Sequence, residues 1–464
     1  MLCRETCGFE SHHRHNTNFT QSPRGLAPEN GGGPGCVDER SCNRSGCSVG
    51  CGPARAPRMQ PIVPLSVSGA ACSVWEMEDV RDFTISIPDA TLRDLRERLD
   101  RTRFAQPIGV EWDGGTDPAY LADFVSSWAR DHDWRLTEAA VNRLPQRLVR
   151  VSAADIHVIH LRARPAPSGW PALPLILTHG WPSSFFEFLA LIGPLTDPTA
   201  HGGDANDAFD VIIPSLPGFG FSSRIREGPT EPSRIAALWV EVMDKLGYGR
   251  FGAYGGDIGS HVTNFLGASH ADRVIGVFTH HPNLHPDVDP AVPLSPAEER
   301  YLRQRDTTRV DRDDSYAAVQ AARPDSLAAG LSDSPAGLAA WLIEKYREWS
   351  DCEGQLESAI DRRTLMDIAT LYWATNSIGT SFLPYRDDPV TPSLPPVTAP
   401  AGLILTPEDA AYPREFAART YRDIRLWRGP EAGGHFLALE QPERLIRDLR
   451  DFYRPLRAAL AEPG

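Results

Sequence analysis

The chain has 464 residues, of which 41% are hydrophobic, and carries a formal net charge of −14 at pH 7. That length allows one large domain with an insertion, or two to three units. An acidic chain lacks the positive surface that nucleic acids and anionic membranes attract, and no apolar run is long enough to span a bilayer. We therefore expect no nucleic acid and no membrane as a partner.

The first 80 residues differ from the rest in composition. Seven of the eight cysteines precede position 73, in a stretch rich in Gly, Pro, Ser, Asn and Arg that has no hydrophobic period. This composition predicts a disordered leader, residues 1–80, and its cysteines lack the spacing of paired zinc knuckles. The alternative interpretation is that residues 1 to about 76 do not belong to the mature protein, which would then start at Met59 or Met77. Because only Cys352 lies in the remainder, we expect no disulfide framework, no metal site and a cytoplasmic location.

Residues 81–165 are predicted to form an N-terminal arm. An alternating run at residues 83–87 is typical of a strand, and the helix after it has three leucines on one face. The tryptophans of the arm are interpreted as apolar anchors that pack it against another domain: Trp112, Trp128 and Trp134. His157 and His160 lie in a short strand and are interpreted as structural residues.

From residue 166 the sequence alternates between strands and helices. Continuous apolar runs predict strands at 173–178, 210–214, 250–254 and 274–278. Runs that are apolar throughout indicate strands covered on both faces, and therefore a mostly parallel sheet in an α/β fold.

The strand pattern stops after residue 285 and returns only near residue 400. Residues 286–388 are helical without a good strand, and a proline-rich linker then leads to strands at 402–405 and 424–427. We interpret 286–388 as a helical lid, inserted between the sixth and seventh predicted strands. It divides the core into two parts, 166–285 and 389–464.

The strand at 250–254 enters the sequence Gly255-Gly256-Asp257-Ile258-Gly259, and a helix-compatible run follows it. A nucleophile between small residues is the pattern of a nucleophile elbow, where a sharp strand-to-helix turn tolerates little side chain beside it. A carboxylate at the apex needs no base to activate it and can form an ester by attacking a saturated carbon. The alternative is a glycine-rich turn whose Asp257 is an ordinary helix N-cap.

The sequence Thr178-His179-Gly180-Trp181-Pro182 follows the first buried strand of the core. In an elbow architecture, an N–H group at such a turn and the N–H after the nucleophile form an oxyanion hole. We assign the backbone N–H groups of Trp181 and Ile258 to this role, and interpret His179 as a residue that orients the turn.

Hydrolysis of an ester on Asp257 requires a base and an acid that orients the base. His435 follows two glycines on the loop after the strand at 424–427, and no other histidine follows residue 285. It is therefore the predicted base. Residues 406–415 contain three carboxylates after a suitable strand, and spacing alone does not choose between them.

From Phe83 to the C-terminus the chain resembles the epoxide hydrolases of the microsomal type, within the α/β-hydrolase superfamily. The resemblance covers about 380 residues and rests on blocks in the arm, the core and the lid: residues 131–134, 156–160, 179–182, 217–222, 255–259, 315–320, 331–339 and 433–436.

The resemblance implies roles for individual residues. It places the nucleophile on Asp257 and the base on His435. It favours Glu415 as the orienting acid, because Tyr412-Pro413-Arg414-Glu415 matches an aromatic-Pro-x-acid turn, with Asp409 in reserve. Two lid tyrosines of the family match Tyr316 and Tyr385, which would hydrogen-bond the epoxide oxygen.

The expected function is hydrolysis of an apolar epoxide to a vicinal diol, without a metal or an organic cofactor, in detoxification and the catabolism of aromatic hydrocarbons. A haloalkane dehalogenase and a catalytically silent ligand-binding protein are the alternatives. The membrane location of mammalian members is not carried over. The identity of the epoxide and the oligomeric state, with a homodimer as one option, stay open.

Overall fold

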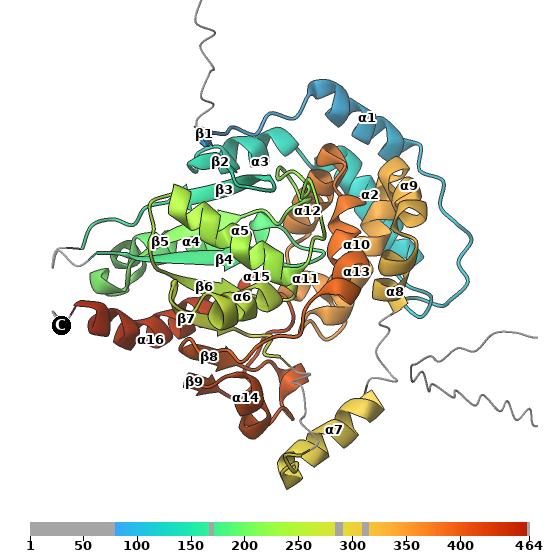
Figure 1. The fold of residues 1–464 in the computed structure, drawn as a ribbon. Helices are drawn as coiled ribbons and strands as arrows, with labels where there is room; N and C mark the ends of the chain where they lie inside the picture. Colours follow the sequence, from blue (N-terminus) through green and yellow to red (C-terminus); the bar gives the residue numbers. More distant parts are fainter. Residues whose placement is uncertain (1–78, 167–170, 284–290, 309–314, 462–464) are drawn as a thin grey trace, which may run out of the picture. The chain divides into compact units, whose positions relative to one another are not determined.

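The computed structural model describes residues 79–166, 171–283, 291–308 and 315–461, all within one unit, Trp75–Gly464. Their main feature is a mixed sheet with the strand order β1-β2-β3-β5-β4-β6-β7-β8-β9 (Figure 1). Its strands are β1 (Val80–Asp82), β2 (Gln146–Arg150), β3 (Asp155–Leu161), β4 (Leu173–Thr178), β5 (Phe209–Pro214), β6 (Phe251–Gly255), β7 (Val274–Thr279), β8 (Ala401–Ile404) and β9 (Ile424–Arg428). Strands β1, β2 and β3 pair antiparallel up to β5, and the pairs from β5 to β9 are parallel. The predicted mostly parallel sheet is therefore confirmed.

Helices cover both faces of the parallel part, as the continuous apolar strands require. Successive strand residues face opposite sides of a sheet. In β7, Val277 contacts Gly267 of α6 (Ile258–Ser269), whereas the neighbouring Gly276 lies against Phe452 of α16 (Pro442–Ala461). Helix α5 (Pro232–Lys245) packs beside α6, and α4 (Leu189–Thr196) packs beside α16.

The N-terminal arm contains α1 (Asp89–Asp100), α2 (Pro118–Asp131) and α3 (Trp134–Val141). Residues 83–87 do not form the predicted strand. The N–H groups of Ile85 and Ile87 instead donate to the side chains of Asn142 and Glu138, while both isoleucines stay buried. The alternation therefore indicated a buried face correctly, but these N–H groups bond side chains and not a neighbouring strand.

Anchoring of the arm by its tryptophans is confirmed for Trp128. Its Nε1 donates to Thr370 Oγ1 at 2.9 Å, and its ring is 2% exposed. The histidines interpreted as structural are also held in place, since His157 is fully buried between Ser215 and Gln146 and bonds both.

Between β7 and β8 the chain is helical where it is described. The helices are α7 (Pro296–Thr308), α8 (Ser315–Ala322), α9 (Pro324–Asp333), α10 (Pro335–Trp349), α11 (Leu356–Ala359), α12 (Arg362–Thr375) and α13 (Leu383–Asp387). Helix α8 packs against α13, and α10 contacts both α12 and the arm helix α2. Two short helices flank β9: α14 (Arg414–Thr420) precedes it, and α15 (Leu437–Glu440) lies between it and α16. The boundaries drawn between leader, arm, core and lid stay predictions.

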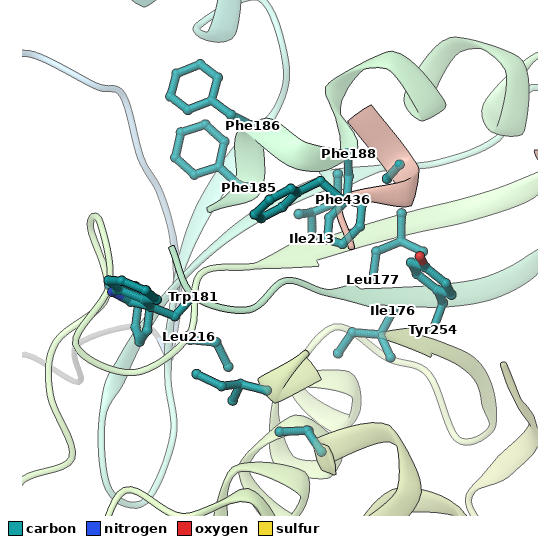
Figure 2. Close-up of a cluster of buried hydrophobic side chains, with 14 of the residues drawn as sticks. Ile176, Leu177, Trp181, Phe185, Phe186, Phe188, Ile213, Leu216, Tyr254 and Phe436 are labelled. Atoms are coloured by element: carbon teal, nitrogen blue, oxygen red, sulfur yellow. The ribbon is translucent and has the colours of Figure 1, made fainter. Parts of the chain in front are cut away.

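The hydrophobic core reaches the ends of β4 and β6, where the functional loops begin. Figure 2 shows aromatic side chains there, from the loop after β4 and from the strand β6. The Phe188 and Tyr254 rings meet edge to face with centroids 6.0 Å apart, and Phe185 and Phe186 stack at 4.7 Å. This packing fixes the loops on which the site is built.

Candidate active site

Asp257 occupies a strained turn between β6 and α6. Its φ of +52° is unusual for a residue with a side chain and marks a conformation that the surroundings must enforce. A Cβ on Gly255 would lie 2.1 Å from the carbonyl oxygen of Gly259, and one on Gly259 would lie 2.0 Å from that of Thr178. The glycines are therefore needed for the close approach of helix and strands, which is the reason why the elbow pattern has small residues there.

The carboxylate of Asp257 faces a backbone donor and an imidazole. The Trp181 N–H donates to Asp257 Oδ1 at 2.8 Å, and His435 Nε2 lies 3.5 Å from Oδ2. A Cβ on Gly180 would lie 2.2 Å from Oδ1, so glycine is required beside the carboxylate. Ile258 begins α6 directly after Asp257, which is the position predicted for the second N–H donor.

His435 is held by its backbone and by aromatic neighbours. Its N–H donates to the carbonyl of Trp349 at 2.9 Å, and its own carbonyl accepts from His280 Nε2 at 2.9 Å. The Trp349 ring lies 4.9 Å from the imidazole and that of His281 lies 4.5 Å from it. Burial lowers the pKa of His280 to about 4, so this neighbour is neutral and donates from Nε2.

The glycines before His435 shape its loop. Gly433 has a φ of +115°, and a Cβ on Gly434 would lie 2.6 Å from the Asp351 nitrogen. Glu440 accepts hydrogen bonds from the N–H groups of Gly434, Phe436 and Asp351, all between 2.7 and 2.9 Å. The loop is thereby tied to the end of α10.

The orienting acid is where the geometry departs from the sequence prediction. Glu415 is exposed at the start of α14 and does not line the cavities that contain Asp257 and His435. A cavity of about 210 Å³ beside these two residues is lined instead by Glu408 and Asp409. Both follow β8 directly, in the turn Pro407–Asp409. The structure therefore does not bring Glu415 to the cavities of Asp257 and His435, and the identity of the orienting acid stays a prediction.

The two lid tyrosines meet over the loop after β4. The Tyr316 ring of α8 stacks on Trp181 with centroids 5.5 Å apart, and the Tyr385 ring of α13 meets Trp181 edge-on at 6.0 Å. The two tyrosine rings lie 5.8 Å apart. Burial, and after it the charge of Asp257, raises the pKa of Tyr385 well above its ordinary value, so its phenol stays protonated. The structure thus brings both predicted tyrosines to the same site.

His179 has the orienting role that the sequence suggested. Its Nδ1 lies 3.0 Å from the carbonyl of Gly180, and its Nε2 accepts the Leu216 N–H at 3.1 Å. Burial lowers its pKa to about 4, and the neutral ring therefore links two loops.

Three residues near the site were not singled out from the sequence. His281 accepts the Asp257 N–H through Nδ1 at 2.8 Å and so supports the elbow. Lys345 is 1% exposed, with its Nζ 5.2 Å from the centre of the Tyr316 ring. Glu187 is 4% exposed and lines a cavity with Asp257 and His435. For Glu187 a signal existed, because it is the one charged residue in the run Phe185-Phe186-Glu187-Phe188.

Among the described residues, no group of three or more His, Cys, Asp or Glu side chains is arranged to hold a metal ion. Cys352 lies within the described residues and is a buried free thiol. No helix in the ranges given above has both the length and the apolar character to cross a bilayer. The cytoplasmic location stays a prediction.

Two family models match the chain. Residues 80–188 match the epoxide hydrolase N terminus, and residues 174–326 match the alpha/beta hydrolase fold. A Stigmatella aurantiaca protein assigned to the epoxide hydrolases is 39% identical over 382 residues, which are 82% of this chain and 86% of that protein. Epoxide hydrolase 1 of Sus scrofa is 29% identical over 414 residues, 83% of this chain and 90% of that enzyme.

Among solved structures, epoxide hydrolases are also similar to this chain. The juvenile hormone epoxide hydrolase of the silkworm Bombyx mori superposes with a TM-score of 0.73 at 26% identity, covering 82% of this chain and 95% of that one. The Aspergillus niger epoxide hydrolase does so with a TM-score of 0.68 at 29% identity, covering 81% and 96%. The chain belongs to the epoxide hydrolase family, as an α/β-hydrolase with an epoxide hydrolase N-terminal domain, and its activity is that of an epoxide hydrolase.

Proposed function

We propose that the enzyme opens an apolar epoxide through a covalent ester on Asp257. The observation that carries the proposal is the surroundings of this carboxylate. Its two oxygens face the Trp181 N–H at 2.8 Å and His435 Nε2 at 3.5 Å, and two phenols meet on the Trp181 ring. These contacts support the roles of nucleophile for Asp257, base for His435 and hydrogen-bond donors for the two phenols.

In the first step Asp257 attacks one epoxide carbon from behind, and the C–O bond to that carbon breaks. The oxygen that leaves becomes an alkoxide and needs a hydrogen-bond donor. Tyr316 and Tyr385 supply it, and one phenol passes its proton to the alkoxide. Burial raises the pKa of Tyr385, so that phenol is protonated when the epoxide binds. The product of this step is a hydroxyalkyl ester of Asp257.

In the second step water attacks the carbonyl carbon of that ester. His435 takes a proton from the water, and the N–H groups of Trp181 and Ile258 stabilise the tetrahedral oxyanion. The Trp181 N–H already donates to an oxygen of this carboxylate, which supports its assignment. When the intermediate collapses, the leaving diol oxygen takes the proton from His435 and the vicinal diol is released. Loss of the second water proton restores the carboxylate and, through solvent, the phenol.

We place the acid that orients His435 on Asp409, the reserve candidate of the sequence analysis. Glu408 and Asp409 both line the cavity with His435, whereas Glu415 does not.

An apolar, aryl-bearing epoxide is the substrate class that the surroundings favour. Around the Trp181 ring lie Tyr316, Tyr385, Trp349 and Phe382, with ring centroids between 5.5 and 6.3 Å from it. Aromatic walls of this kind bind flat apolar groups and exclude water from the reacting carbon.

Mass analysis of intact protein after mixing with styrene oxide tests the proposal. His435→Gln should gain the mass of one substrate molecule and then stall, because loss of a general base slows ester hydrolysis about 10²- to 10⁴-fold. Asp257→Asn should gain no mass and form no diol. Diol formation by Asp257→Asn at the wild-type rate would refute the nucleophile, and halide release from a haloalkane without any diol would favour a dehalogenase.

A further inference from the structure

A small cavity lies next to the nucleophile and the base. Asp257 and His435 both line it, together with Ser183, Glu187 and Phe436. Its volume is about 10 Å³, and a cavity needs roughly 10–15 Å³ to hold one water molecule. The space beside the reacting carboxylate is therefore of the size of a single water, and polar groups from two loops face it.

Glu187 is an unusual residue to find in this wall. Its side chain is 4% exposed, and Phe185 and Phe188, which flank its turn, are fully buried. Among the described residues it forms no ion pair with a Lys, Arg or His, although a buried charge normally needs such a partner. Packing alone would be satisfied by an apolar residue of similar length.

The protonation state of Glu187 suits a place beside a second carboxylate. Burial raises its pKa to about 8, and the charges of Asp257 and Glu440 add to the shift. At neutral pH it is therefore a neutral carboxylic acid. Its carbonyl oxygen can accept a hydrogen bond without repelling the Asp257 nucleophile.

Ser183 provides a second observation at the same place. Its residue is 1% exposed and lines the same cavity. Its side chain hydrogen-bonds the Glu187 carboxyl group, and this contact opposes part of the rise in the pKa of Glu187. Ser183 therefore helps to fix the Glu187 side chain at the cavity wall.

We propose that this cavity binds the hydrolytic water and that Glu187, with Ser183, is the positioning residue that orients it between His435 Nε2 and the carbonyl carbon of the Asp257 ester. The inference rests on the proposed ester route. The water oxygen bonds to that carbon, one water proton passes to His435 Nε2, and the remaining O–H donates to Glu187. The bond from the carbon to the diol oxygen then breaks, and that oxygen takes the proton from His435. Asp257 keeps the oxygen of the water and loses the second water proton, which restores through solvent the phenol that protonated the epoxide oxygen.

Single-turnover kinetics with styrene oxide and excess enzyme test this role, because rapid quenching separates ester formation from ester hydrolysis. Glu187→Met keeps the length of the side chain and removes the acceptor. It should leave ester formation within about threefold of the wild type and slow hydrolysis about 10- to 100-fold, the scale of a misplaced reactant. Glu187→Gln retains a carbonyl acceptor and should restore hydrolysis to within about fivefold of the wild type, a recovery that reflects the orienting hydrogen bond.

Ser183→Ala removes only one oxygen and guards against a folding defect in the larger substitution. It should slow hydrolysis about 3- to 10-fold, since one orienting hydrogen bond of about 1 kcal/mol is lost. Equal slowing of both steps in Glu187→Met, or a Gln variant as slow as Met, would overturn the positioning role. Absence of any ester on Asp257 in the wild type would instead refute the proposed function itself, so the two failures are distinguishable.

Discussion

Removal of the Tyr385 hydroxyl tests how the enzyme stabilises the leaving oxygen. Tyr385→Phe keeps the ring, which packs edge-on against Trp181 at 6.0 Å and against Tyr316 at 5.8 Å. The lid contacts should therefore survive. Because only a hydroxyl is lost, we expect the thermal stability of the variant to stay close to that of the wild type.

The expected loss of rate follows from the burial of the Tyr385 phenol. The Tyr385 hydroxyl oxygen is shielded from solvent, and burial with the charge of Asp257 keeps it protonated. A donor to a developing oxyanion in such a site contributes about 2.7–4 kcal/mol, or about 10²- to 10³-fold in rate. Because Tyr316 remains as a second donor, we expect Tyr385→Phe to slow ester formation about 10²-fold. Tyr316 is only half-buried, so Tyr316→Phe should have a smaller effect.

Stopped-flow fluorescence is a suitable assay, because Trp181 contacts both tyrosine rings and should respond when substrate binds and reacts. The two single variants and the double variant are compared in ester formation and in ester hydrolysis. Only the first step should slow, and the double variant should be slower than either single one. Ester formation by Tyr385→Phe within about threefold of the wild type would show that this phenol is not the proton donor.

Three further predictions concern the acid that orients His435, the glycine beside Asp257 and the buried Glu187. Asp409→Asn should slow ester hydrolysis by about 10²-fold or more, whereas Glu415→Gln should stay within about twofold; equal effects in quench kinetics would contradict the assignment. Gly180→Ala places a Cβ 2.2 Å from Asp257 Oδ1 and should slow ester formation about 10²-fold while circular dichroism stays unchanged. A normal rate in that variant would argue against the need for glycine. The pKa of Glu187 rises on folding from its ordinary 4.5 to about 8, so the folded protein binds more protons between these values and loses stability as pH rises through them. Glu187→Gln cannot titrate, so the variant should lack this pH dependence, which amounts to at most about 1.4 kcal/mol of unfolding free energy per pH unit. The difference in melting temperature between wild type and variant should therefore change from pH 6 to pH 8, and an unchanged difference would refute the prediction.

The fold could be predicted where local pattern and tertiary environment agree. Strands such as β4 and β7 are apolar throughout because helices cover both faces, and that signal is visible in the sequence. Strand β2 (Gln146–Arg150) was missed because its sequence, QRLVR, is mostly polar and only half-buried. Residues 83–87 were wrongly predicted as a strand, since alternation reports a buried face and not a hydrogen-bonding partner.

The site could be predicted as far as it depends on backbone turns. Asp257 and His435 are flanked by glycines that the local geometry requires, and those glycines are visible in the sequence. The orienting acid depends on which loop ends near the imidazole, and three carboxylates close together in sequence did not reveal that Glu415 is exposed at the start of α14 and lines neither cavity. Glu187 was overlooked because a single acid in an aromatic run does not show which cavity it lines.

The central claim, an ester between substrate and Asp257, is tested most directly by isotope transfer in a single turnover. Excess enzyme is mixed with styrene oxide in water enriched in heavy oxygen, and both the diol and the peptide that contains Asp257 are then analysed by mass spectrometry. The ester route takes the new diol oxygen from the carboxylate, so the first diol should be unlabelled and the peptide should become heavier. A labelled diol with an unlabelled peptide would mean that water attacks the epoxide directly, and the role given to Asp257 would be wrong.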